Sequence, residues 1–191
     1  MPRNKEFNQD EVLDKSIQLF WEKGYNACSM QDVVDGLGLS RSSIYDTFTD
    51  KRNLFLQSLK KYQEDYTSIV INMLRDSSDI RKTLQDIFDS IVQDVEKCSQ
   101  KGCFMTNSTI ELAHTDEEVA KIIGSNKQQL ESAFERALQK GQDLGQISPK
   151  NNPKILSKYL YSNLAGLRVI AKNKPHPDEI REIIALIMQA L

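Results

Sequence analysis

The five prolines lie near the two ends of the sequence: Pro2, Pro149, Pro153, Pro175 and Pro177. Because proline breaks the hydrogen bonding of helices, the long stretch between the first two of them favours long, uninterrupted helices. Apolar residues recur at helical steps in two clear segments: Leu84, Ile87, Phe88, Ile91, Val92 and Val95, and Ile180, Ile183, Ile184, Ile187, Met188 and Leu191. No comparable stretch alternates with the period of two that marks a strand. The sequence therefore predicts an all-α fold.

The helical pattern also predicts how the chain is organised. We expect about nine helices, at residues 7–23, 29–36, 40–47, 50–74, 80–98, 104–113, 116–144, 152–173 and 177–190. The first three are short and closely connected, whereas the later ones are mostly long and amphipathic. This difference predicts an N-terminal three-helix module, residues 1–50, and a C-terminal helical bundle, residues 51–191, joined by the helix at 50–74.

Composition limits the classes of partner and the cellular compartment. Charged residues make up 27% of the 191 residues and the formal net charge is -2, so the overall charge does not indicate an anionic partner. The odd number of cysteines, Cys28, Cys98 and Cys103, indicates no disulfide framework. The N-terminus does not resemble a signal peptide, and no apolar run is long enough to span a membrane. We expect a cytoplasmic protein with no membrane partner and no cofactor.

Residues 29–48 carry the signals of two short helices around a tight turn. Ser29 followed by Asp32 indicates a capping box at the start of the first helix. Gly36 and Gly38 should end that helix, and Gly38 suits a left-handed turn position. Ser40 can cap the second helix. Two short helices joined in this way predict a helix-turn-helix.

The second of these helices has the chemistry of a DNA-reading element. Its outer face offers Arg41, Ser42, Ser43, Tyr45 and Thr47. An arginine can bind guanine O6 and N7 together in the major groove, and short hydroxyl side chains can reach bases or phosphates. A plain helical bundle also contains short helices around turns, so both interpretations remain open from this stretch alone.

A longer stretch, Leu19 to Phe55, reads "LFWEKGYNACSMQDVVDGLGLSRSSIYDTFTDKRNLF". This stretch resembles the DNA-binding module of the TetR/AcrR family of bacterial transcriptional regulators. Later segments resemble the family more weakly, namely "KGCFMTNS", "KGQDLGQIS", "NNPKILSKYL" and "NLAGLRVIAK". The resemblance implies a homodimeric repressor that binds double-stranded operator DNA, and whose C-terminal helices bind a small-molecule effector.

By position, the resemblance implies that the DNA contacts are Ser29, Gln31, Arg41, Ser42, Ser43, Tyr45, Thr47 and Lys51, with Tyr45 and Lys51 on phosphates. Asp46 departs from the family, in which an aromatic residue or histidine is common. A carboxylate there repels phosphate unless it faces solvent or accepts from a cytosine amino group. Residues 1–61 hold nine basic and nine acidic side chains, so the binding face must be positive locally, through Arg3, Lys5, Arg41 and Lys51.

An effector pocket inside the bundle should be mostly apolar with a few inward polar groups. The candidate lining residues are Tyr62, Tyr66, Phe88, Cys103, Phe104, Met105, Asn107, Ser108, Glu111, Tyr159 and Asn163. For each aromatic residue and methionine, simple core packing is the alternative, and no ligand class follows from the set. Trp21, Phe20 and Tyr25 are predicted to pack between helices and not to stack on bases.

Four other possibilities remain to be weighed from the sequence: a thiol sensor, an enzyme, a metal site and an architectural protein. Cys103 stands at a helix start beside Lys101, where the helix dipole and the lysine can lower a thiol pKa; this predicts a redox or electrophile sensor with Cys98 as a possible resolving partner. An enzyme would use Cys103 as nucleophile and His114 or His176 as base, but no pairing follows from the sequence, and we expect no catalytic site. The "HTDEE" run at 114–118 offers metal ligands, although acidic residues at a helix start also follow from the dipole, and we expect no metal. An architectural DNA-binding protein would use the bundle only as a dimer scaffold.

Overall fold

The computed structural model describes residues 7–99 and 101–191, and its secondary structure there is entirely helical. The helices are α1 (Gln9–Lys23), α2 (Met30–Leu37), α3 (Arg41–Phe48), α4 (Lys51–Tyr62), α5 (Ser68–Asp76), α6 (Ile80–Glu96), α7 (Phe104–Leu112), α8 (Glu117–Asp143), α9 (Pro153–Ile170) and α10 (Pro177–Gln189). A π-helical turn, Gln63–Thr67, joins α4 to α5, and a 3₁₀ turn, Ala171–Asn173, follows α9. The predicted all-α fold is confirmed.

Helix starts are fixed by local side chains. The residue before each of eight helices accepts a hydrogen bond from a backbone N–H of the first turn: Asn8, Ser29, Ser40, Asp50, Asp79, Asp116, Asn152 and His176. Pro153 and Pro177 begin α9 and α10, where the missing N–H costs no hydrogen bond. These local signals explain why the observed helix starts lie within two residues of the expected ones.

Helices α1 to α4 share one apolar core with the helices beside them. Ile17, Phe20, Ile44 and Phe48 are fully or almost fully buried in it. The Phe20 ring meets Phe55 of α4 edge to face, with the ring centres 5.2 Å apart. The same core continues into α7 and the start of α8 through Phe104, Leu112, Val119, Ile122 and Ile123. This packing places the first half of the linking helix with the N-terminal module. The domain boundary expected at residue 50 stays a prediction.

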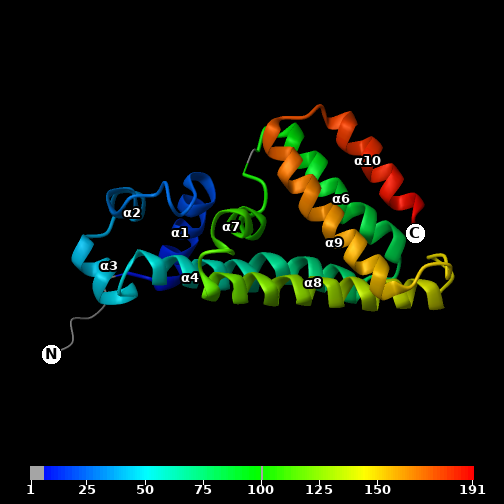
Figure 1. The fold of residues 1–191 in the computed structure, drawn as a ribbon, viewed down its shortest axis with the longest axis horizontal. Coiled ribbons are helices and arrows are strands. Elements are labelled where there is room, and N and C mark those ends of the chain that lie inside the picture. The colour runs from blue at the N-terminus through cyan, green and yellow to red at the C-terminus, as the bar shows by residue number, and fades with distance from the viewer. Residues whose placement is uncertain (1–6, 100) are drawn as a thin grey trace.

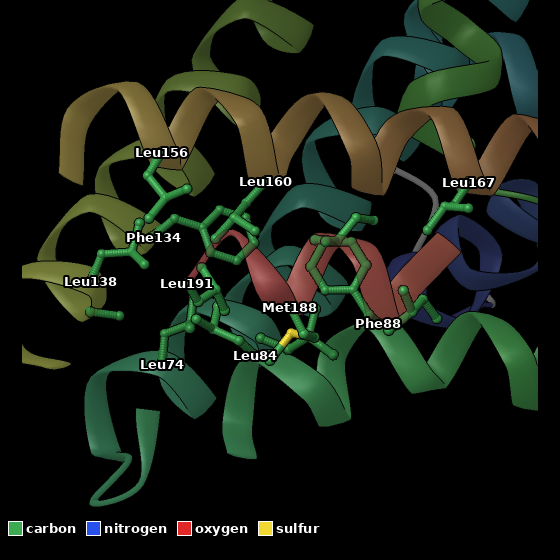
Figure 2. Close-up of a cluster of buried hydrophobic side chains, with 14 of the residues drawn as sticks. Leu74, Leu84, Phe88, Phe134, Leu138, Leu156, Leu160, Leu167, Met188 and Leu191 are labelled. Carbon is green, nitrogen blue, oxygen red and sulfur yellow. The ribbon is translucent and has the colours of Figure 1, made fainter. Parts of the chain in front are cut away.

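The second core lies between α5, α6, α8, α9 and α10. Figure 2 shows Leu156, Leu160 and Leu167 pointing from one face of α9 toward Phe88 of α6 and Phe134 of α8, with Met188 and Leu191 below them. All seven are at most 6% exposed. Because burying each of these side chains is worth about 2–3 kcal/mol, this core holds the C-terminal helices together.

The linking helix runs along the molecule beside α8. In Figure 1, α1, α2 and α3 lie at one end, and α6, α9 and α10 at the other, and the linking helix and α8 run side by side along the bottom of the view. The helix expected at 50–74 is observed over residues 51–76, but its middle turn, Gln63–Thr67, is π-helical. Counting α4, this turn and α5 as one helical run gives nine helices within residues 7–99 and 101–191, the number expected. Turns of this kind are rare and occur frequently at functional sites.

Candidate nucleic-acid interface and effector cavity

The predicted helix-turn-helix is confirmed in α2 and α3. Ser29 and Asp32 form the complete capping box at the start of α2. Gly38 ends α2 with φ 66°, in the left-handed region that favours glycine. Gly36, which we expected to help end α2, instead lies inside it, against Leu19 of α1. The Ser40 hydroxyl accepts from the Ser43 N–H and caps α3.

The outer face of α3 is open to solvent. Ile44 and Phe48 are fully buried, so Arg41, Ser42, Tyr45 and Asp46 must lie on the other side, and all four are exposed. Within residues 7–99 and 101–191, the side chains of Arg41, Tyr45 and Asp46 make no hydrogen bond or ion pair. The face therefore presents an unpaired guanidinium, a phenol and a carboxylate to a partner, with Asp46 facing solvent.

The remaining polar residues of the two helices are tied to their own neighbours. The hydroxyls of Ser42 and Ser43 lie 2.9 and 2.8 Å from that of Ser40. The Ser29 hydroxyl donates to Asp32 at 2.7 Å. The Gln31 amide donates to Asp35 at 2.8 Å. Thr47 is half-buried. These residues must exchange local bonds or share them in order to contact DNA, and Arg3 and Lys5 lie outside the described residues.

Lys51, expected on a phosphate, binds the turn between α1 and α2. Its ammonium donates to the carbonyl oxygens of Tyr25 and Cys28 at 2.8 and 2.7 Å. It also lies 4.2 Å from the centre of the Tyr25 ring. Since an ammonium has three N–H donors, two hold the turn and one is left. Lys51 therefore also fixes the position of α2, and its contact with a phosphate stays a prediction.

Glu111 of α7 binds the same turn and lies outside the cavity of the helical bundle that is described below. Its carboxylate accepts from the backbone N–H groups of Tyr25 and Asn26, at 3.1 and 2.7 Å. Gly24, with φ 79°, turns these two N–H groups toward α7, and a Cβ there would lie only 3.1 Å from the carboxylate. The charge of Glu111 is therefore bound at the end of α1, and its role in effector binding stays a prediction.

A cavity of about 330 Å³ lies between the linking helix, α6, α8 and α9. Of the predicted lining residues it holds Tyr62, Tyr66, Cys103 and Met105. The Tyr62 and Tyr66 rings stack, with centres 4.7 Å apart, and the Tyr62 hydroxyl lies 3.8 Å from the Cys103 sulfur. Burial raises the pKa of Tyr62 well above its usual value, so this phenol stays protonated and can donate.

The other predicted lining residues lie elsewhere. Phe88 is fully buried in the second core. Phe104, Asn107 and Ser108 line a separate surface groove against the end of α1, together with Glu111. Tyr159 and Asn163 sit on the outer face of α9, since Leu156, Leu160 and Leu167 take its inner face. These corrections share one cause: helical spacing shows which residues share a face, but not what that face meets.

Several cavity residues were missed by sequence reasoning. They are Trp21, Thr67, Ser90, Asp94, Asn126, Tyr161 and Arg168. Trp21 does pack between helices, as expected, but it also forms part of the cavity wall although it belongs to α1. Asn126 could have been predicted from the sequence, because it is a polar residue among the apolar positions of α8 that are buried between Val119 and Leu130. The Arg168–Asp94 ion pair joins α9 to α6 and had no local signal.

The residues of the enzymatic and metal hypotheses have structural partners. Asp116 caps α8 and forms two hydrogen bonds with Arg52, at 2.7 and 2.8 Å. His176 caps α10, and His114 is exposed. Across the described ranges, no group of three or more His, Cys, Asp or Glu side chains could hold a metal ion. None of the helices described is both long and apolar enough to cross a membrane.

Comparison with known families matches both parts of the chain. The model for "Bacterial regulatory proteins, tetR family" matches residues 12–57, which include the helix-turn-helix. The model for "Tetracyclin repressor-like, C-terminal domain" matches residues 81–187. The second match alone covers more than half of the chain.

Individual proteins agree with these matches. The HTH-type transcriptional regulator YezE of Bacillus subtilis is 33% identical over 195 residues, covering 100% of both chains. The HTH-type transcriptional repressor ComR of Escherichia coli is 27% identical, covering 95% of this chain and 87% of ComR. A structure of the TetR family regulator CifR, a cysteine mutant complexed with operator DNA, has a TM-score of 0.82 at 19% identity, covering 100% and 99% of the chains. The chain therefore belongs to the TetR family of bacterial DNA-binding transcriptional regulators.

Proposed function

We propose that this protein is a repressor that reads an operator with α3 and is released from it by a small molecule bound in the cavity. The observation that carries the DNA-reading role is the outer face of α3, where Arg41 and Tyr45 have no partner in the described residues. An arginine at the start of a helix in the major groove can bind guanine, and a tyrosine hydroxyl can bind phosphate. ComR is named a transcriptional repressor, which supports the same direction of control here.

The wall of the cavity supports an effector that acts on both α1 and the linking helix. Trp21 lies at the end of α1, and its indole N–H donates to the carbonyl oxygen of Lys101 at 2.9 Å. The Lys101 ammonium in turn binds Gln18 and Glu22 of α1, at 2.8 and 2.6 Å. On the other side of the cavity, Tyr62 is the last residue of α4 and Tyr66 lies within the π turn. A ligand that displaces these side chains acts on the helices that position α3.

The operator-bound form is proposed to be a homodimer. Large apolar side chains are exposed on α9 and α10: Ile155, Tyr159, Val169, Ile170 and Leu186. Ala165 and Gly166 of α9 would let a partner helix approach closely. Two copies of α9 and α10 can bury these side chains in a two-fold, four-helix interface. Light scattering at micromolar concentration should give the mass of a dimer, and a monomer would contradict the proposal.

The repressor function is tested with the DNA upstream of the protein's own gene. We expect a gel shift on this DNA that survives an excess of shuffled DNA of equal composition. A reporter placed behind the same DNA should be silenced by the wild-type protein. The Arg41→Ala variant should not silence it. Activation of the reporter would contradict repression, and equal binding to shuffled DNA would contradict operator reading.

Cys103 favours a second candidate, in which a thiol adds to or replaces the small-molecule signal. Its sulfur lines the cavity and is half-exposed, and Cys98 lies in the preceding loop with its side chain exposed. Hydrogen peroxide would oxidise the Cys103 thiol to a sulfenic acid, releasing water. If this candidate holds, peroxide releases the wild-type protein from its DNA but not the Cys103→Ser variant. Equal release of both would exclude it.

A cytoplasmic location follows from the proposed partner, because bacterial operator DNA lies in the cytoplasm. No catalytic role is proposed for any residue.

A further inference from the structure

Aromatic rings form one side of the cavity that we assign to the effector. Tyr62 and Tyr66 are nearly parallel, with 15° between their planes. The Trp21 ring stands edge-on to both, at 5.2 and 6.0 Å between ring centres. Tyr161 completes the aromatic lining, and burial raises the pKa of its phenol, which keeps it neutral. Flat aromatic surfaces of this kind favour a planar ring by stacked or edge-to-face contacts.

Asn126 supplies a buried polar group that points to a specific ligand feature. Asn126 is only 3% exposed, and it lines the cavity. The Thr67 hydroxyl donates to its Oδ1 at 2.7 Å. Its Nδ2 amide has no acceptor among the residues that the structure describes. No fully buried side-chain nitrogen or oxygen in the described residues lacks a partner, so this N–H group must be accessible from the cavity. An oxygen acceptor on a ligand could therefore bind it.

The charges of the cavity cancel within the protein. Asp94 and Arg168 are the acidic and basic side chains among its described lining residues. They form an ion pair with each other, and Arg168 also donates to the Ser90 hydroxyl at 3.1 Å. A ligand with a net charge would have to break this pair or remain without a counter-charge. Solvent reduces the cost of both outcomes, because the Arg168 side chain is 24% exposed and that of Asp94 42%.

We propose that the cavity binds an uncharged, planar aromatic compound that carries an oxygen acceptor, with its ring among Trp21, Tyr66 and Tyr161 and its oxygen on the Asn126 amide. Only the role of this ligand as the effector depends on the proposed function. Binding itself can be measured without DNA.

Three probes of one ring size separate the requirements: 2-acetonaphthone is uncharged with an acceptor, naphthalene has no acceptor, and 2-naphthoate is anionic. Calorimetry on the full chain should show 2-acetonaphthone binding about tenfold more tightly than naphthalene, as one added hydrogen bond allows. It should bind at least about tenfold more tightly than 2-naphthoate. Equal affinity for the first two, tighter binding of the anion, or no binding of 2-acetonaphthone would each overturn the proposal.

A pair of variants on α8 assigns the preference to the amide. Asn126→Leu replaces the amide by an apolar group of similar size, and should bring the affinities for 2-acetonaphthone and naphthalene together. Gln128→Leu makes the same kind of change at an exposed position of the same helix, and should keep the tenfold preference. A preference that survives in Asn126→Leu would show that another group binds the oxygen.

Operator binding, measured by gel shift without any probe, keeps the two hypotheses distinguishable. If the probe preference is found and no operator is bound, the ligand class stands and the repressor function fails. If the operator is bound and the probe preference is absent, the repressor function stands and the ligand class is wrong.

Discussion

Arg41 stands directly after the Ser40 cap of α3, with its guanidinium exposed and unpaired in the described structure. If it reads a guanine, Arg41→Ala should cost about 1–3 kcal/mol of operator affinity and relax the preference at one base pair in each half-site. Fluorescence anisotropy with singly substituted operators measures this. Tyr45→Phe, which would remove the phosphate contact proposed for this hydroxyl, should weaken all sequences alike. A uniform loss in Arg41→Ala as well would show that Arg41 only holds phosphate.

Lys51 is expected to matter for folding as well as for DNA. Replacing it by methionine removes two hydrogen bonds from an ammonium to the turn after α1, and should lower the free energy of unfolding by about 1–3 kcal/mol. Losing one phosphate contact should reduce the salt slope of operator binding by about 1. Urea denaturation and a salt titration measure the two effects. Lys60→Met is the control, because Lys60 is exposed, and equal stability of the two variants would contradict the structural role.

Residue roles were predictable where the cause is local. The Ser29 capping box and the Gly38 turn could be predicted because each involves residues no more than four apart. The contacts of Lys51 and Glu111 could not, because they join positions 23 to 86 residues apart in the sequence. Their charges gave no indication of which backbone groups the fold would place opposite them.

At the scale of elements, the start of α4 is tied to the start of α8 by Arg52 and Asp116. The Arg52 guanidinium lowers the pKa of Asp116 from its usual 3.8 to about 2. Because the folded-state pKa is depressed, the stabilisation is fully present above about pH 4 and is lost as the pH falls toward 2. Both side chains reach solvent, so its size should be about 1 kcal/mol or less.

Comparing Asp116→Asn with the wild type tests this pair. An asparagine keeps the helix-capping oxygen but loses the charge. The difference in unfolding free energy between the two proteins, measured with urea, should be largest at neutral pH and should shrink toward zero near pH 2. A difference that is constant over this range would show that the ion pair does not stabilise the fold.

The helices themselves were largely predictable, because apolar periodicity and caps lie within each segment. The π turn at Gln63–Thr67 was not, because its residue types also suit an ordinary α-helix. It coincides with a tertiary contact, the Thr67–Asn126 hydrogen bond to α8, which no property of the segment itself could indicate.

On the scale of the whole molecule, the two modules are less separate than the sequence suggested. The first core includes α7 and the start of α8, and the effector cavity includes Trp21 of α1. The two-part architecture followed from the contrast between short and long helices. The contribution of Trp21 to the cavity wall could not be predicted from the sequence, because it depends on how α1 is positioned against the loop before α7.

Ligand binding in the cavity and operator binding are proposed to oppose each other, and calorimetry can measure this coupling. Trp21 is the single tryptophan of the chain, so quenching of its fluorescence can identify a ligand of the cavity. That ligand is then titrated into free protein and into protein saturated with operator. We expect weaker binding to the DNA complex, by a factor that corresponds to about 1–3 kcal/mol, since coupling is reciprocal. Equal affinity for both forms would contradict it and leave the bundle as a dimer scaffold.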